Sequence, residues 1–216
     1  MKRTALIVAG GVGSRFKSKT PKQFVEYNGI PILMNTLHKF SFVNEIILVI
    51  PKSHLSTWKK LCEKHSFNLI HKVITGGNNR FESVREGLNE IDKESIVAIH
   101  DGVRPNISIK LIKKLYDNYL SGHAVIPIIK SKDSIIITQN RKINYLDRDN
   151  ISKVQTPQVF NSLEIKDLYQ KHDFKNFTDD ASAFISKGGQ LITIEGEESN
   201  IKITTKSDLK LLNLYL

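Results

Sequence analysis

Thr4-Ala-Leu-Ile-Val8, followed directly by Ala9-Gly-Gly-Val-Gly-Ser-Arg-Phe-Lys-Ser-Lys-Thr-Pro-Lys-Gln-Phe24, sets the organisation of this chain. The first five residues are mostly apolar and partly β-branched, which predicts a buried strand, so the glycines follow at the strand's end. Ligands bind at that end of the strands in α/β sheets. Glycine lets backbone N–H groups approach a phosphate closely, and basic side chains add positive charge. The segment therefore predicts a polyphosphate site with Gly10, Gly11, Gly13, Arg15, Lys17, Lys19 and Lys22.

Two familiar glycine loops do not match this segment. A P-loop requires a Gly-Lys pair, and the chain has none. A dinucleotide fingerprint counted from Gly11 places Phe16 where the third glycine belongs, and Pro51-Lys52 stands where an acidic ribose ligand would follow the second strand. A simple tight turn stays open as an alternative, because glycine-rich turns are common.

Strand and helix patterns alternate along the first two thirds of the chain. The predicted strands span residues 4–8, 45–50, 69–74, 96–100 and 124–129, and the predicted helices span 31–42, 53–65, 80–91 and 108–120, with Ser53 as a helix cap. Helices at 162–172, 178–187 and 206–215 and a strand at 190–194 follow later. This order predicts an α/β fold with a mainly parallel sheet between helices.

The pattern changes between residues 131 and 153, where two short strands, 132–138 and 143–149, surround a polar turn. A two-stranded ribbon cannot bury enough apolar surface to be stable alone, so its isoleucines need an external cover. A second copy of the chain is the expected cover. We therefore predict one domain, residues 1–216, with 131–153 as a dimerisation arm.

Composition limits the other classes of function. The chain has 216 residues and a formal net charge of +10, yet its lysines are spread out and no nucleic-acid-binding motif accompanies them. Cys62 is the single cysteine, so a disulfide within the chain is excluded, and no apolar run has the length of a membrane span. We expect a cytoplasmic protein that binds neither nucleic acid nor membranes.

Six motifs together resemble one enzyme family. Gly-Gly-x-Gly-Ser-Arg with Pro-Lys-Gln-Phe resembles the signature loop of the sugar-phosphate cytidylyltransferases, most closely the branch that uses 2-C-methyl-D-erythritol 4-phosphate in isoprenoid synthesis. The likeness continues through Gly76-Gly-Asn-Asn-Arg-Phe-Glu-Ser83, His100-Asp-Gly-Val-Arg-Pro105, Gln155-Thr-Pro-Gln158, Thr178-Asp-Asp-Ala-Ser182 and Asn200-Ile-Lys-Ile-Thr204. It implies a Rossmann-like fold of the nucleotide-diphospho-sugar transferase type, Mg²⁺ as cofactor, and a homodimer in which the arm reaches the partner's active site.

The resemblance also implies a role for each matching residue. Arg15, Lys22, Lys202 and the arm residue Arg148 are the expected catalytic cations. The expected CTP contacts are Ala9, Gly10, Gly11, Gly13, Arg15, Lys22, Gly77, Asn78, Arg80, Ser83, Asp101 and Lys202. The expected acceptor contacts are Asp101, Arg104, Ser134, Arg148, Thr156 and Thr178. Asp101 is the candidate carboxylate near Mg²⁺, while His100 is interpreted as structural.

The acceptor has a second candidate. Gly10 stands where many methylerythritol phosphate enzymes have Ala, a feature shared with enzymes that use ribitol 5-phosphate. Asp-Gly-Val-Arg-Pro, Thr-Asp-Asp-Ala-Ser and the short chain favour methylerythritol phosphate. A regulator that binds nucleotides without catalysis and a dehydrogenase stay open as alternatives from other classes.

Overall fold

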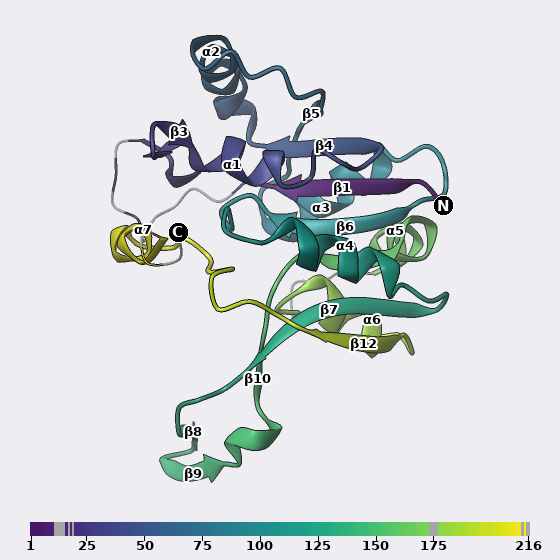
Figure 1. Ribbon diagram of the computed structural model, residues 1–216. Helices are drawn as coiled ribbons and strands as arrows, with labels where there is room; N and C mark the ends of the chain where they lie inside the picture. Colours follow the sequence, from purple (N-terminus) through teal and green to yellow (C-terminus); the bar gives the residue numbers. More distant parts are fainter. Residues whose placement is uncertain (11–15, 17, 19, 173–176, 213, 215–216) are drawn as a thin grey trace.

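A computed structural model describes residues 1–10, 16, 18, 20–172, 177–212 and 214 (Figure 1). Its centre is an eight-stranded sheet in the order β10-β7-β11-β6-β1-β4-β5, with β12 as an additional partner of β7. The strands are β1 (Arg3–Val8), β4 (Glu45–Ile50), β5 (Lys72–Thr75), β6 (Ile96–Asp101), β7 (His123–Lys130), β10 (Ser152–Val154), β11 (Gln158–Asn161) and β12 (Gln190–Glu195). β10 and β11 run antiparallel to their neighbours, and the other pairs are parallel. The sheet is thus mainly parallel, as predicted.

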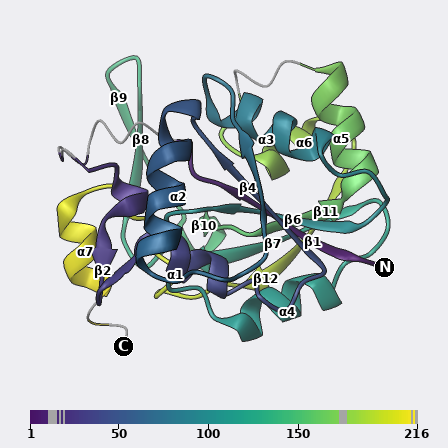
Figure 2. The same ribbon diagram turned by 90° about the horizontal axis from the view of Figure 1, so that it is seen from above.

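Helices cover both faces of the sheet (Figure 2). One layer contains α1 (Ile32–His38), α2 (Leu55–Lys64) and α4 (Ile109–Asp117), and the other contains α3 (Arg80–Asn89), α5 (Ser162–Lys171) and α6 (Asp180–Ser186). Along β1, Ala5 and Ile7 pack toward the first layer, while Leu6 and Val8 pack toward the second. Successive strand residues point to opposite faces, so a strand covered on both sides is apolar throughout.

Several predicted boundaries were wrong. β10 and β11 fall in a stretch for which no strand was predicted. Ser53 does not cap a helix, because it lies inside a 3-10 turn, η3 (Lys52–His54), that precedes α2. The helix expected from residue 178 begins at Asp180, and the side chain of Asp179 caps it by accepting from the Ser182 backbone N–H. The closing helix, α7 (Lys206–Leu212), begins at the predicted residue, and residues 213, 215 and 216 lie outside the described residues.

Short elements connect these layers. A 3-10 turn, η2 (Lys22–Phe24), precedes the paired β2 (Glu26–Tyr27) and β3 (Ile30–Pro31), and another, η4 (Arg148–Asn150), precedes β10. The described ranges contain no helix that is long and apolar enough to cross a membrane.

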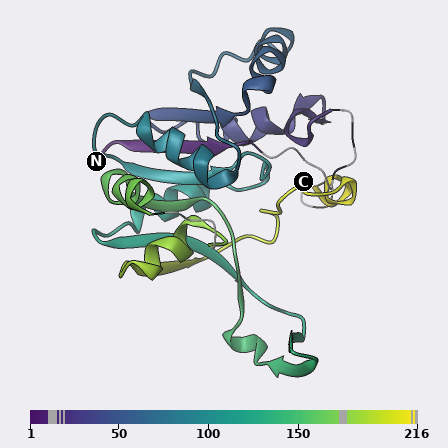
Figure 3. The ribbon, with the colours of Figure 1, turned by 180° about the vertical axis from the view of Figure 1, so that it is seen from behind.

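The segment predicted as an arm forms a hairpin of β8 (Ile135–Gln139) and β9 (Lys142–Leu146) that projects away from the main sheet (Figures 1 and 3). Most of its apolar side chains are exposed in the single chain: Ile143 is 62% and Tyr145 79% accessible. The hairpin therefore presents apolar surface to its surroundings.

Candidate active site

A cavity of about 270 Å³ opens at the carboxyl ends of β1 and β6. These strands are parallel and in register, so Val8 and Asp101 end side by side. The cavity is lined by Val8, Ala9, Gly10, Lys22, Gln23, Asn78, Asn79, Arg80, Asp101, Val103 and Lys202. Its position agrees with the rule that α/β sheets bind ligands at the carboxyl ends of their strands.

A second cavity of about 250 Å³ shares three residues with the first, namely Arg80, Asp101 and Lys202. Its other lining residues are Arg104, Val154, Gln155, Thr156, Gln158, Thr178 and Asp179. A carboxylate and two cations therefore stand between two cavities, which is an arrangement suited to two ligands that react with each other.

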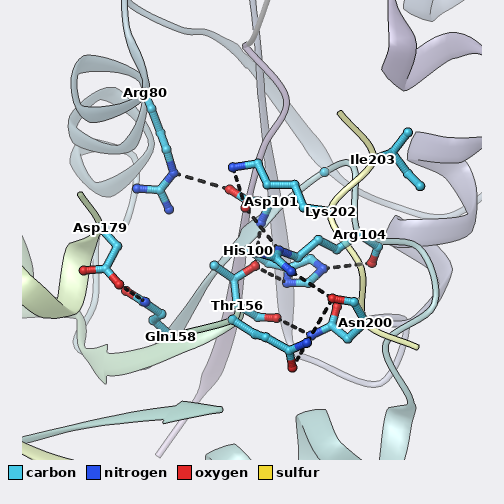
Figure 4. Close-up of polar contacts among 12 residues, drawn as sticks. Arg80, His100, Asp101, Arg104, Thr156, Gln158, Asp179, Asn200, Lys202 and Ile203 are labelled. Atoms are coloured by element: carbon cyan, nitrogen blue, oxygen red, sulfur yellow. Dashed lines mark hydrogen bonds and ion pairs between the residues drawn. The ribbon is translucent and has the colours of Figure 1, made fainter. Parts of the chain in front are cut away.

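Asp101 is the centre of a cluster of charges (Figure 4). Its Oδ2 lies 3.0 Å from Lys202 Nζ and 3.2 Å from Arg104 Nε, and its Oδ1 lies 3.4 Å from Arg80 Nε. Burial alone would raise the pKa of Asp101, but the charges of the three cations outweigh it and hold the pKa well below its usual range. Asp101 is therefore ionised, and it holds the cations against their mutual repulsion.

His100 supports this cluster as a neutral ring. Its Nε2 faces the Arg104 carbonyl oxygen at 3.2 Å, so Nε2 carries the hydrogen and Nδ1 accepts from the Thr156 hydroxyl, 3.0 Å away. Burial lowers the pKa of His100 to about 4. Thr156 Oγ1 in turn accepts from the Asp101 backbone N–H at 3.1 Å. This geometry agrees with the structural role expected for His100.

Lys22 is positioned by the residues that follow it. Phe24 is buried against Trp58, with ring centroids 6.1 Å apart, and the Gln23 amide donates to the Ala9 carbonyl at 3.0 Å. Lys22, between these two anchors and the glycine segment, lines the first cavity and donates to the Ile203 carbonyl at 3.0 Å. Lys22 and Lys202 thus meet at this cavity from opposite ends of the chain.

The start of α3 forms another part of the wall of the first cavity. Asn79 caps the helix by accepting from the Glu82 N–H, and Glu82 accepts from the N–H and the amide of Asn78. Ser83 is 1% exposed and donates its hydroxyl hydrogen to the Asn79 carbonyl, so its oxygen has only acceptor capacity left. A Cβ added at Gly77 would lie 2.3 Å from Glu82 Cβ, so the tight turn here requires glycine.

The structure brings together ten of the predicted site residues on the two cavity walls. They are Ala9, Gly10, Lys22, Asn78, Arg80, Asp101, Arg104, Thr156, Thr178 and Lys202. Gly77 and Ser83 lie beside the walls and line neither cavity. Gly11, Gly13, Arg15, Lys17 and Lys19 lie outside the described residues.

Ser134 and Arg148 are not part of this assembly in the single chain. They belong to the exposed hairpin segment, where Arg148 donates to the Lys132 carbonyl at 3.5 Å. Neither residue lines either of the two cavities.

Sequence reasoning missed Gln23, Asn79, Val103, Gln158 and Asp179 as wall residues. The spacing of Asn79 and Glu82 matches a helix N-terminus signature and could have identified the first turn of α3. Gln158 lies on the unpredicted strand β11, so no local signal revealed its direction.

The donor set at Asp101 fits a magnesium ion only in part. Among the described residues, no three His, Cys, Asp or Glu side chains are grouped as metal ligands. Mg²⁺ is usually held by one or two carboxylates together with substrate phosphates and water. Asp101 Oδ1 has acceptor capacity left, because its contact with Arg80 is long. One protein carboxylate is thus available, and phosphates would supply the other ligands.

Comparisons with known proteins agree on one family. The model of the 2-C-methyl-D-erythritol 4-phosphate cytidylyltransferase family matches residues 4–216. Enzymes of that name from Bacteroides fragilis and Porphyromonas gingivalis (strain W83) are each 41% identical to this chain, with 100% of the chain covered and 100% and 98% of the relatives. The crystal structure of the 4-diphosphocytidyl-2C-methyl-D-erythritol synthase from Anaerococcus prevotii is 33% identical, with a TM-score of 0.85 and coverage of 99% of this chain and 95% of that one. The chain therefore belongs to the 2-C-methyl-D-erythritol 4-phosphate cytidylyltransferase family, whose members are CTP-dependent nucleotidyltransferases.

Proposed function

We propose that the chain transfers the cytidylyl group of CTP to 2-C-methyl-D-erythritol 4-phosphate, in isoprenoid precursor synthesis. The products are 4-diphosphocytidyl-2-C-methyl-D-erythritol and pyrophosphate. One observation carries the proposal: two cavities share a wall made of Arg80, Asp101 and Lys202. We assign the cavity beside the glycine segment to CTP and the cavity beside Thr156 to the acceptor.

The reaction needs positioning and cationic stabilisation rather than a protein nucleophile. An oxygen of the acceptor phosphate forms a bond to the α-phosphorus of CTP, and the bond from that phosphorus to the β-phosphate oxygen breaks. Pyrophosphate leaves with the bonding electrons. Negative charge increases on the leaving group and spreads over the equatorial oxygens, so fixed cations are the effective catalysts.

The described residues divide these tasks by position. Lys22 and Lys202 lie at the CTP cavity, where each ammonium group can stabilise the phosphates during displacement. The Lys202 side chain is 39% exposed although it pairs with the buried Asp101, so a phosphate in the cavity can reach its ammonium group. Arg104 offers the remaining N–H donors of its guanidinium to the acceptor phosphate. Thr156 lines the same cavity and keeps His100 in place, because its hydroxyl hydrogen is donated to His100 Nδ1.

The same proposal includes Mg²⁺. Asp101 would hold it together with phosphate oxygens of the substrates, and the bound ion would neutralise phosphate charge. The chain's own contribution is to keep Asp101 ionised beside the cavity, which Arg80, Arg104 and Lys202 ensure.

We further propose a cytoplasmic homodimer that forms through the hairpin. Exposed apolar side chains on β8 and β9, among them Ile136, Ile143 and Tyr145, support a protein cover for this surface. The two predicted acceptor contacts on this segment, Ser134 and Arg148, would then come from the partner chain.

Pyrophosphate release tests the proposed reaction. The purified chain is incubated with CTP and Mg²⁺, and methylerythritol phosphate or ribitol 5-phosphate is added in parallel. We expect release with the first acceptor alone, and we expect EDTA to abolish it. Release with ribitol 5-phosphate alone would mean that this compound is the acceptor. No release with either acceptor would refute cytidylyl transfer to both compounds.

A further inference from the structure

We propose that Asp180 and Tyr169 are positioning residues, which act on the reaction by holding the Arg80 guanidinium at the wall between the two cavities. Asp180 and Tyr169 line neither cavity. The inference rests on the proposed function, in which CTP occupies the cavity beside Arg80, and it adds two buried residues to the machinery.

Arg80 is held from two sides. Its NH1 and NH2 donate to Asp180 Oδ1 and Oδ2 at 2.8 and 2.7 Å, so the two groups form a bidentate pair. Its Nε points to Asp101 Oδ1 at 3.4 Å. Figure 4 shows the Nε contact of Arg80 with Asp101, and the two hydrogen bonds to Asp180 fix the remaining nitrogens of the same guanidinium.

Asp180 is itself fixed. It is 0% exposed, and its Oδ1 also accepts a hydrogen bond from the hydroxyl of Tyr169. Tyr169 is 2% exposed, and burial beside Asp180 raises the pKa of its phenol, so it stays a donor at neutral pH. Both oxygens of Asp180 are thus committed to defined donors.

The backbone of Asp180, at the start of α6, is also held by hydrogen bonds around the helix N-terminus. Asp179 and Ser182 form a reciprocal capping box at the helix N-terminus. The Gln158 side chain, from β11 in the centre of the sheet, donates to Asp179 Oδ2 at 2.8 Å and accepts from the Ala181 N–H at 2.9 Å. A chain of contacts therefore connects the sheet, α6 and Arg80.

This arrangement sets which contacts Arg80 makes. Because NH1 and NH2 of Arg80 donate to Asp180, only its Nε can donate to Asp101, through Oδ1. Oδ2 of Asp101 is therefore left to Arg104 and Lys202. Without Asp180, NH1 and NH2 of Arg80 would be free to bind Asp101 or a phosphate bidentately. A bidentate pair with Asp101 would displace Lys202 from Oδ2. Burial alone would lower the pKa of Arg80, but Asp180 and Asp101 raise it well above its usual value, so Arg80 keeps its charge.

The test is a double-mutant cycle on steady-state kinetics. We expect Asp180→Asn to lower kcat/KM for CTP about 10- to 100-fold, the usual effect of losing a supporting contact behind a ligand. Tyr169→Phe should lower it about 3- to 10-fold, the contribution of one hydrogen bond. In an Arg80→Lys background, where no bidentate pair forms, Asp180→Asn should have little further effect. Asp180→Glu, which keeps the charge, should retain more activity than Asp180→Asn.

Tyr116→Phe is the matched control. Tyr116 is also 2% exposed and donates its hydroxyl to a backbone carbonyl, that of Thr4, in the opposite helical layer. The Tyr116→Phe variant should be destabilised about as much as the Tyr169→Phe variant. At a temperature where both variants are folded, Tyr116→Phe should keep wild-type kinetics. Equal kinetics for the two variants, or full additivity in the cycle, would overturn the inference.

A second measurement separates this inference from the proposed reaction. Restricted rotation of the Arg80 guanidinium, followed by ¹⁵N NMR, should be detectable in the wild-type chain and lost in Asp180→Asn without substrates present. If the wild-type chain releases no pyrophosphate, the proposed reaction is refuted. The same double-mutant cycle of Asp180 and Arg80 variants is then measured through the affinity for CTP, by calorimetry, in place of kcat/KM. Free rotation in wild type would overturn the positioning role whatever the activity.

Discussion

Lys202 connects the two cavities through a side chain that is only loosely held. Its ammonium group is paired with Asp101, yet 39% of the side chain is exposed. Its loss would leave the buried Asp101 carboxylate paired with Arg80 and Arg104, so the cost in stability should be small, whereas a cation at a displaced phosphate contributes much to rate. Catalysis and stability should therefore respond differently to its removal.

Replacing Lys202 with Gln should lower kcat about 10²- to 10³-fold, by analogy with the loss of one oxyanion donor. The melting temperature should stay near that of wild type, because Arg80 and Arg104 still neutralise Asp101. Initial rates of pyrophosphate release and a thermal melt check both expectations. Lys110→Gln, the same change at an exposed position of α4, is the control and should keep full activity. A Lys202→Gln enzyme with wild-type kcat would contradict the assigned role.

His54 couples pH to the anchoring of the Lys22 segment. The amide of Gln23 lies 3.2 Å from its Nδ1, which accepts only in the neutral ring. Burial lowers the pKa of His54, so the unfolded chain binds this proton more readily than the folded chain does. Its neutral form therefore favours folding above the ordinary histidine pKa of about 6.5, and this contribution is lost as pH falls below that value.

The expected result is a fall in the urea midpoint between pH 7.5 and 5.5 that is steeper in wild type than in His54→Asn. Asn keeps an acceptor for Gln23 and does not titrate. His100 is also destabilising when protonated, since burial lowers its pKa to about 4, but it is present in both proteins and cancels in the comparison. Parallel pH profiles would show that His54 does not contribute.

Glycine 87 shows how closely α3 approaches β1. A Cβ built at Gly87 would lie 2.2 Å from Leu6 Cδ1, so helix and strand touch without an intervening side chain. Alanine favours a helix over glycine by about 1 kcal/mol, whereas overpacking a core costs about 1–3 kcal/mol. Because Asn79 and Arg80 at the start of α3 line the first cavity, which we assign to CTP, the distance of α3 from the sheet also affects the width of that cavity.

We therefore expect Gly87→Ala to be destabilised by about 1 kcal/mol or more in urea unfolding, with a raised KM for CTP. Arg85→Ala, at an exposed position on the same helix, should change stability by less than about 0.5 kcal/mol. A stabilised Gly87→Ala protein would mean that Leu6 moves aside without cost.

The parallel strands were predictable because both faces of each are covered, which produces apolar runs such as Glu45–Ile50. Strand β11 was not predictable from the sequence, because it is only four residues long and because its place between β6 and β7 is decided by partners distant in sequence. The residues of the candidate site also divide into those that a local motif predicts and those that long-range contacts bring together. Lys22 and Asp101 were predictable from local motifs, whereas the pair of Arg80 and Asp180 joins residues 100 positions apart.

The projecting hairpin is the feature that supports the proposed homodimer. Tyr145 and Ile143 are largely exposed, and Arg148 lies on this segment rather than on either cavity wall. Two copies that exchange hairpins would bury this apolar surface and bring a guanidinium to each acceptor cavity. The hydrophobic contacts would hold the dimer, and the arginine would make each site depend on both chains.

Two inactive variants should then complement each other. Arg148→Ala removes the guanidinium that one chain lends, and Lys22→Ala removes a cation from the chain that borrows it. A mixed dimer has one site with both defects and one site with neither, so random pairing gives half of the dimers as hybrids and about a quarter of wild-type activity per site. Pyrophosphate release is measured after the two proteins are mixed under conditions that exchange subunits.

The control is a mixture of Arg148→Ala with the double variant Arg148→Ala and Lys22→Ala, in which every site lacks Arg148. It should stay inactive, since no pairing restores a complete site. Exchange itself is followed by mass spectrometry of differently tagged chains. No recovery in the first mixture, with hybrids present, would place Arg148 outside the shared site. The exposed apolar hairpin would then serve association alone.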